Sequence, residues 1–411
     1  MINVKLENFA KIKDTTVQTN DITVVAGKPS TGKSFFMKFC YAILESHLKT
    51  ERGDIVKDYF YSKELSYDLI KVYIEEFLTH ITDSKDNADK LNHQLRIGDL
   101  FHKSIQAHDY TKALDLYQQS SNQQENTLKL LKNKIGEQNT ILSGSPEEHV
   151  EFYIRNILQS IFRDMTQINN NFRVTFDTFQ VTYDHNKIDI KNKKPLDGVS
   201  NVVFVETPLI LEFEKFMTKE KFKTPYHIES LLNQLEENFE FTDSNEDKFI
   251  SDFNQKIFEI INGNIDKSAK GFIFTNSEGK DFDIVNVSSG IKSLGLLQYL
   301  VNNKILKNKS VLFWEEPEVH LHPTWQIKMA DLFLYMMEQD IKIIFSTHSP
   351  YICDYLNAAS QKRKLRDRVS FNLFGKDQNQ VVTNKVLSKE NWKELQSELL
   401  DPLEEIMWEY L

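Results

Sequence analysis

The octet Gly27-Lys28-Pro29-Ser30-Thr31-Gly32-Lys33-Ser34 constrains this chain more than any other segment, because it has the pattern G-x-x-x-x-G-K-S. It follows the apolar run 22–26, typical of a buried strand, and precedes an apolar periodicity typical of a helix. In this setting the backbone N–H groups face phosphates, Lys33 reaches the β- and γ-phosphates, and Ser34 offers its hydroxyl to Mg²⁺. The alternative is a chance octet in a loop, which the flanking strand and helix disfavour. We therefore expect ATP to bind at Gly27, Pro29, Ser30, Thr31, Gly32, Lys33 and Ser34, with Ser34 also on the magnesium.

The composition predicts a folded chain with long helices. Of 411 residues, 40% are hydrophobic, and glycine (13) and proline (9) occur at about half their average usage, so few turns are specified. A net charge of −10 excludes a protein that coats nucleic acid with its whole surface, although it allows a local basic groove. Two cysteines exclude a disulfide framework and a cysteine zinc cluster. Because no apolar run is long enough to cross a bilayer, we expect a cytoplasmic protein without a membrane partner.

The spacing of apolar residues predicts two domains. Residues 46–169 repeat apolar positions every three and four residues, in segments of one to two dozen residues, which indicates a helical insertion packed as a bundle rather than a long coiled coil. Residues 1–45 and 170–411 form the other domain, where strands and helices alternate in α/β order. The strands expected there are 172–176, 180–183, 187–190, 202–205, 272–274, 282–284, 311–314, 341–345 and 369–374, and the helices are 209–262, 290–303, 324–339, 350–357 and one from about 389.

Two carboxylates end one of these predicted strands. Glu315 and Glu316 follow the apolar run 311–314 directly. Next to a phosphate-binding loop, Glu315 is suited to hold magnesium through water, and Glu316 to orient or deprotonate the attacking water. An ordinary acidic strand end is the alternative for this pair alone.

Two further segments carry a resemblance to a known family. Residues 315–323 (Glu-Glu-Pro-Glu-Val-His-Leu-His-Pro) and 346–350 (Ser-Thr-His-Ser-Pro) resemble the Walker B, D-loop and switch-histidine segments of ABC-type ATPases of the overcoming-lysogenization-defect (OLD), RecF and SMC clade. The resemblance covers 1–45 and about 170–375, and is greatest to the stand-alone ATPase subunits of bacterial anti-phage modules of the Septu or PARIS type. It implies a two-lobed α/β ATPase head with a mixed sheet and flanking helices.

The resemblance also implies roles for other residues. His348 would act in catalysis by contacting the γ-phosphate, which is preferred to the alternative of a core histidine. Ser288, Ser289 and Gly290 fit the family's signature loop, which binds the nucleotide of the facing subunit, although Ser-Ser-Gly before a helix is usually only a cap. His320 and His322 could suggest a metal pair, but no third ligand is spaced nearby, so the D-loop interpretation is preferred.

The chain departs from the family at several positions. The usual Asn-Gly of the phosphate loop is Pro29-Ser30, and the usual aspartate before the catalytic glutamate is Glu315. Both changes affect the expected turnover more than nucleotide binding. The family's glutamine loop should follow strand 202–205, where the chain has Glu206-Thr207-Pro208, so no residue is assigned to it.

The implied function is a regulatory and scaffold ATPase subunit of an anti-phage complex. It would form a head-to-head dimer or higher oligomer and control a separately encoded toxic effector, expected to be a nuclease, since this sequence shows no second catalytic pattern and too few residues follow His348 for the nuclease domain of OLD proteins. The alternative is a RecF-like, ATP-dependent DNA-binding repair clamp. The basic run Lys362–Arg368 could contact nucleic acid, although such runs are usually solvated faces.

Overall fold

The computed structural model describes residues 2–52, 145–177, 179–185, 187–192, 198–217, 224–236, 244–269, 271–376, 382–388 and 390–400. The chain divides into two compact units, Met1–Leu48 with Tyr153–Leu411, and Lys49–Phe152. Most of the predicted helical insertion lies outside the described residues, so its bundle architecture stays a prediction. Residues 153–169 belong to the first unit, because the end of α7 (Pro146–Phe162) packs there: Phe162 stacks on Phe35 at 5.6 Å.

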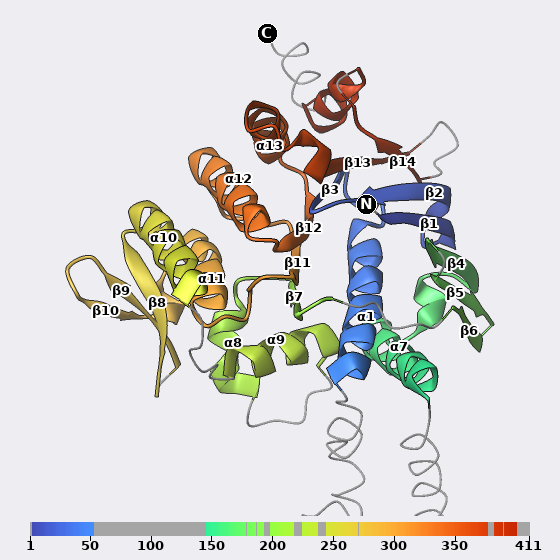
Figure 1. The fold of residues 1–411 in the computed structure, drawn as a ribbon, viewed down its shortest axis with the longest axis horizontal. Helices are drawn as coiled ribbons and strands as arrows, with labels where there is room; N and C mark the ends of the chain where they lie inside the picture. The colour runs from blue at the N-terminus through green and yellow to red at the C-terminus, as the bar shows by residue number, and fades with distance from the viewer. Residues whose placement is uncertain are drawn as a thin grey trace, which may run out of the picture. The chain divides into compact units, whose positions relative to one another are not determined.

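One large mixed sheet organises the first unit (Figure 1). Its strand order is β6-β5-β4-β1-β2-β14-β13-β3-β12-β11-β7. Four neighbouring pairs at the β13–β7 end are parallel, so the carboxyl ends of these strands meet at one edge. The parallel strands are β3 (Ile22–Gly27), β7 (Asn201–Val205), β11 (Ser310–Glu315), β12 (Lys342–Thr347) and β13 (Val369–Lys376).

The other half of the sheet is built mainly from antiparallel pairs. It contains β1 (Ile2–Phe9), β2 (Ile12–Thr19), β4 (Asn171–Phe176), β5 (Phe179–Asp184), β6 (Lys187–Lys191) and β14 (Val382–Val386). A separate three-stranded sheet has the order β10-β9-β8 and consists of β8 (Gly263–Ser268), β9 (Gly271–Asn276) and β10 (Asp281–Asp283).

Helices cover both faces of the parallel strands. Along β11, Trp314 faces α12 while Phe313 faces the opposite way and meets Tyr41 of α1, because successive side chains of a strand point to opposite faces. The helices are α1 (Lys33–Arg52), α8 (Ile210–Met217), α9 (Tyr226–Glu236), α10 (Ser244–Ile261), α11 (Ser289–Asn302), α12 (Pro323–Glu338), α13 (Pro350–Lys362) and one over 392–400.

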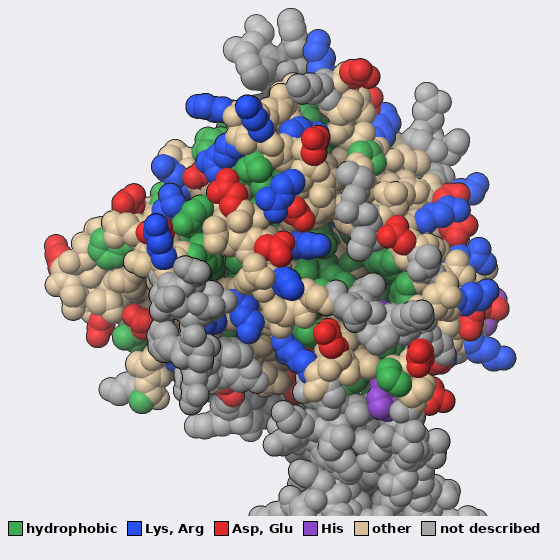
Figure 2. All heavy atoms as spheres, in the orientation of Figure 1, with side chains coloured by type: hydrophobic (Ala, Val, Ile, Leu, Met, Phe, Trp, Pro, Cys, Tyr) green, Lys and Arg blue, Asp and Glu red, His purple; other side chains and the backbone are tan. Residues whose placement is uncertain are grey.

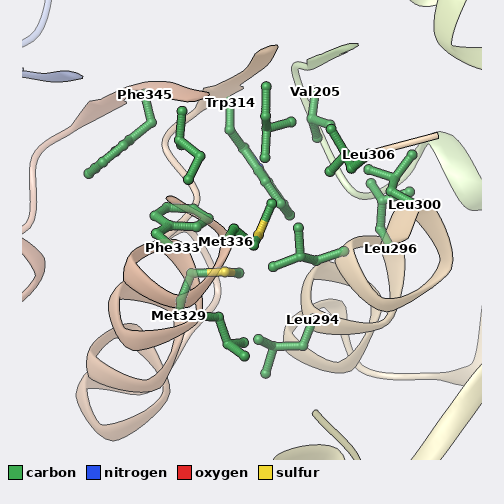
Figure 3. Packing of buried hydrophobic residues seen from close by; sticks show 14 of the residues in the cluster. Val205, Leu294, Leu296, Leu300, Leu306, Trp314, Met329, Phe333, Met336 and Phe345 are labelled. Atoms are coloured by element: carbon green, nitrogen blue, oxygen red, sulfur yellow. The ribbon is translucent and has the colours of Figure 1, made fainter. Parts of the chain in front are cut away.

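The core of this unit centres on Trp314. Side chains from α11 and α12, including Leu296 and Phe333, converge beneath it (Figure 3). The Trp314 and Phe333 rings lie 6.3 Å apart, and Phe333 and Phe345 lie 5.3 Å apart. Burying each such side chain contributes roughly 1.5–3 kcal/mol. The packing holds β11 and β12 rigidly, and these strands end at the candidate site.

The predicted α/β fold is confirmed. β8 and β14 were not among the predicted strands, and within β8 only Ile265 supplies an apolar signal. The close approach of Gly263 to β9 explains its glycine: a Cβ there would lie 2.4 Å from the Thr275 carbonyl oxygen. β14 is short and mostly polar. No helix among the described residues has the length and apolar character needed to span a membrane.

Candidate nucleotide-binding site

The loop between β3 and α1 adopts a backbone that its glycines permit. Gly27 has φ 138°, and a Cβ on it would lie 2.1 Å from the Phe374 carbonyl oxygen of the neighbouring strand. Gly32 has φ 88°, and Ser30 also lies in the left-handed region at φ 61°. The loop therefore requires glycine at both ends. Gly27 is needed for its backbone conformation and its close contact with the neighbouring strand, and Gly32 for its backbone conformation.

Lys33 lies inside this loop. Its Nζ donates hydrogen bonds to the carbonyl oxygens of Gly27 and Lys28, both at 2.9 Å. Burial lowers the pKa of Lys33 from 10.5 to about 8, while the nearby carboxylates Glu316, Glu318 and Glu315 oppose this shift. Among the described residues, no carboxylate lies within ion-pair distance of this ammonium. It lies at the N-terminus of α1, a position suited to binding an anion such as a phosphate.

The carboxyl ends of β7 and β11 bring two glutamates together. Trp314 pairs with Val205 in parallel register, so the next residues, Glu315 and Glu206, leave the sheet side by side. Lys38 Nζ lies 2.9 Å from Glu206 Oε1 and 3.9 Å from Glu315 Oε1. The signal for Glu206 was present in the sequence, because it follows the apolar run 202–205 as Glu315 follows 311–314. Lys38 had no such signal.

His227 of α9 completes this group. Its Nε2 lies 2.7 Å from Glu206 Oε2, and this hydrogen bond, together with Lys38, lowers the pKa of Glu206 to about 2 despite partial burial. The pKa of His227 is itself lowered, chiefly by burial. Sequence reasoning missed His227, because a histidine 21 residues beyond Glu206 gives no local pattern.

Glu315 fits the magnesium that a phosphate-binding loop implies. Burial raises its pKa to about 7, and Lys38 and a hydrogen bond with Ser34 act in the opposite direction. Its Oε1 is buried and has no hydrogen-bond partner among the described residues. Such an oxygen is costly unless a proton or cation satisfies it, and Mg²⁺ prefers oxygen ligands. Ser34 and Glu315 are therefore the residues that could hold the metal.

Glu316 and His348 lie together at the ends of β11 and β12. His348 Nε2 is 3.3 Å from Glu316 Oε1, and hydrogen bonding from His348 lowers the pKa of Glu316. The Glu316 backbone has φ 46° and its N–H donates to the Ser346 carbonyl at 3.1 Å. The carboxylate is thus ionised and half-exposed, as a proton acceptor for water must be.

Buried Glu318 connects the same two loops. Its Oε1 accepts a hydrogen bond from the His348 backbone N–H at 2.7 Å, and burial raises its pKa. The sequence analysis gave Glu318 no role. Its contact fixes the backbone of His348, and thereby the ring that faces Glu316.

The Ser-Ser-Gly segment has contacts of its own at the start of α11. Ser288 caps α11 by accepting a hydrogen bond from the Ile291 N–H at 3.5 Å. Gly290 packs against the loop after β11, where a Cβ would lie 3.1 Å from the His320 carbonyl oxygen. Among the described residues, no hydrogen bond or ion pair joins Ser288, Ser289 or Gly290 to Lys33, Glu315 or Glu316.

The two histidines of the D-loop segment have local structural roles. His322 caps α12, accepting at Nδ1 from the Thr324 N–H at 3.3 Å, and His320 is an exposed residue with φ 68°. The described residues contain no group of three or more His, Cys, Asp or Glu side chains placed to hold a metal ion.

The arginines of the basic run 362–368 form contacts within the protein. Arg363 pairs with Asp331, Arg366 donates to Asn357, Val369 and Leu387, and Arg368 pairs with Asp21 at 2.6 Å. On the face that Figure 2 shows, Lys and Arg side chains are interspersed with Asp and Glu rather than gathered in one patch. These contacts favour a structural role for the run.

Comparisons with known proteins place the chain in a family. The sequence profile of the AAA ATPase domain matches residues 1–353. No curated protein matches the chain. Among solved structures it is similar to an SMC head bound to the C-winged helix domain of ScpA, at 11% identity, 95% and 98% coverage of the two chains and a TM-score of 0.43. It is also similar to the SMC head domain from Thermotoga maritima, at 10% identity, 94% and 98% coverage and a TM-score of 0.39. The profile match spans most of the sequence and includes the loop at 27–34, Glu315, Glu316 and His348, so the chain belongs to the AAA ATPase domain family and is an ATPase.

Proposed function

We propose that this ATPase is a regulatory and scaffold subunit of a bacterial anti-phage complex. ATP and Mg²⁺ bind at the loop 27–34, with Ser34 and Glu315 on the metal, Glu316 activating water and His348 contacting the γ-phosphate. The chain pairs head to head with a second copy, whose Ser288, Ser289 and Gly290 complete the site. A separately encoded effector, a nuclease, binds elsewhere and responds to the nucleotide state.

The continuity of α1 is the observation that carries this proposal. The helix begins at Lys33 in the phosphate-binding loop and runs to Arg52, while the second compact unit begins at Lys49, inside the same helix. A nucleotide that moves the start of α1 therefore has a covalent, hydrogen-bonded route into the second unit. A partner bound to that unit would respond only if it preferred one nucleotide state over the other.

The described residues with catalytic groups lie at the nucleotide site, which supports a second activity carried by a separate protein.

Trp392 of the C-terminal helix contacts other residues of the same chain: its ring packs on Phe371 at 4.9 Å and its Nε1 donates to Asp354 at 2.8 Å. Docking of a partner through this tryptophan is therefore disfavoured. Trp408, the other tryptophan near the end of the chain, lies outside the described residues.

Co-expression tests the proposal. The chain is expressed alone and with its neighbouring gene, as wild type, Lys33→Ala and Glu316→Gln, and cell growth under phage challenge, pull-down and nucleic-acid cleavage are measured. We expect the single chain to be harmless, and protection to require both proteins and an intact Lys33. Magnesium-dependent cleavage by the purified chain alone, unaffected by Lys33→Ala, would refute the scaffold role. ATP-dependent DNA binding without a partner would instead support the repair-clamp alternative.

A further inference from the structure

Lys38 occupies an unusual position for a lysine, between the two glutamates at the metal-binding edge of the sheet. Its Nζ is 2.9 Å from Glu206 Oε1 and 3.9 Å from Glu315 Oε1, and its side chain is 18% exposed. Building on the magnesium site proposed above, we propose that the Lys38 ammonium acts as its counter-ion, neutralising Glu206 and Glu315 until nucleotide and metal bind together.

The electrostatics of the two glutamates require such a charge. Two carboxylates at adjacent strand ends repel each other, and burial makes this repulsion stronger than it would be in water. Glu315 is only 14% exposed, so water cannot screen it fully. The ammonium of Lys38 offsets both charges from a fixed point on α1, five residues after Lys33.

Glu206 cannot easily turn away from this position. Its second oxygen, Oε2, is hydrogen-bonded to His227, which is buried in α9. Its first oxygen therefore stays directed at Lys38. If Lys38 were uncharged, this oxygen and the unpartnered Oε1 of Glu315 would form a pair of carboxylate ligands with no cation between them.

This arrangement has a consequence for metal binding. In the nucleotide-free protein a divalent cation meets the positive charges of Lys38 and Lys33, so Glu206 and Glu315 alone attract it weakly. A triphosphate adds enough negative charge to reverse that balance. Lys38 thus makes metal binding depend on bound nucleotide, and the Glu206 carboxylate holds the Lys38 ammonium in position.

Mn²⁺ binding to the nucleotide-free protein tests this role without requiring hydrolysis or a partner. Mn²⁺ serves as a spectroscopic substitute for Mg²⁺, with free and bound ion distinguished by electron paramagnetic resonance. We expect weak binding to wild type and binding about ten- to a hundredfold tighter to Lys38→Met, because a positive charge near the cation is removed. Lys38→Gln, which can still donate a hydrogen bond to Glu206, is expected to bind Mn²⁺ with intermediate affinity and covers the case in which the methionine variant does not fold.

Two matched variants complete the experiment. Lys292→Met removes another buried lysine that pairs with a single glutamate, Glu212, at 2.5 Å, and should gain no Mn²⁺ affinity. The double variant Lys38→Met/Glu206→Gln should lose the gain, because Glu315 is then the one carboxylate left of the pair. Equal Mn²⁺ affinity in wild type and both folded Lys38 variants would overturn the proposal, as would a gain that survives in the double variant.

Discussion

At the scale of single residues, Lys33 and Glu316 occupy opposite environments within one site. Lys33 is buried, and its carbonyl contacts hold its charge in the loop. Glu316 is half-exposed and stays ionised through His348. Lys33 is thus suited to bind phosphates in the ground state, whereas Glu316 is suited to act on water only during the reaction.

Substituting these two residues should therefore separate binding from hydrolysis. Lys33→Ala should abolish nucleotide binding. Glu316→Gln should bind ATP as wild type does but hydrolyse it about 10²–10⁴-fold more slowly, because the base is lost. Titration with a fluorescent ATP analogue and phosphate-release kinetics measure the two effects. Hydrolysis by Glu316→Gln at the wild-type rate in the presence of magnesium would show that another group is the base.

Another residue of α1 makes stability depend on pH. His47 is buried against Phe179, neither ring nitrogen has a hydrogen-bond partner among the described residues, and burial lowers its pKa to about 4. The unfolded chain, with a histidine pKa of 6.5, binds this proton more readily. The stabilisation is therefore complete above pH 6.5 and is lost as pH falls towards 4.

We expect this histidine to account for a fall of about 3 kcal/mol in the free energy of unfolding across that interval. His47→Phe should remove this contribution, and the exposed His185→Gln should leave it unchanged. Urea unfolding between pH 4 and 7 measures the difference. A pH dependence that is the same in His47→Phe and wild type would assign it to other groups.

At the scale of secondary-structure elements, Arg366 of the run 362–368 links α13 to the neighbouring segments. Arg366 bonds Asn357 of α13 and the carbonyls of Val369 and Leu387, and its guanidinium lies 4.9 Å from the centre of the Phe371 ring. Arg366 therefore links the middle of α13 to the start of β13 and to the segment after β14.

Arg366→Ala should accordingly lower the free energy of unfolding by about 1.5–3 kcal/mol, the usual effect of losing hydrogen bonds to a charged group. The exposed Lys362→Ala should change it by less than about 0.5 kcal/mol. Denaturant unfolding compares the two, and an electrophoretic mobility assay with DNA and RNA shows whether either substitution affects binding. Unchanged stability in Arg366→Ala with a loss of nucleic-acid binding would reverse the structural interpretation.

At the scale of the whole molecule, we propose a nucleotide site shared between two copies of the chain. Lys33 interacts with Glu315 and Glu316, and Glu316 lies beside His348. Gly290 of the segment 288–290 instead packs against the loop that contains His320. A second copy would supply that segment, and ATP would then bind the paired state better than the single chain and shift the population towards it.

Light scattering of Glu316→Gln with and without ATP tests this pairing. We expect ATP to double the mass, because the variant binds nucleotide without consuming it. Adding Ser289→Arg should prevent the increase by placing a large charged side chain at the start of α11. The same mass in all three samples would count against a site shared between two copies.

The features of this protein that depend only on neighbouring residues were predictable from the sequence. The glycines of the octet 27–34 specify a backbone with positive φ, and the apolar runs before Gly27 and Glu315 specify two buried strands that end at the site. These features were predictable because steric freedom at glycine and the apolarity of a buried strand act within a few residues.

Which distant groups meet depends on how the elements pack. Parallel register places Glu206 beside Glu315, and the packing of α1 and α9 brings Lys38 and His227 to them, across 168 and 21 residues from Glu206. The same holds for β8 and β14, which are strands because of the neighbours they pair with, and for Arg366, whose partners lie on three segments. Their roles depend on long-range pairing and burial, which no short stretch of sequence encodes.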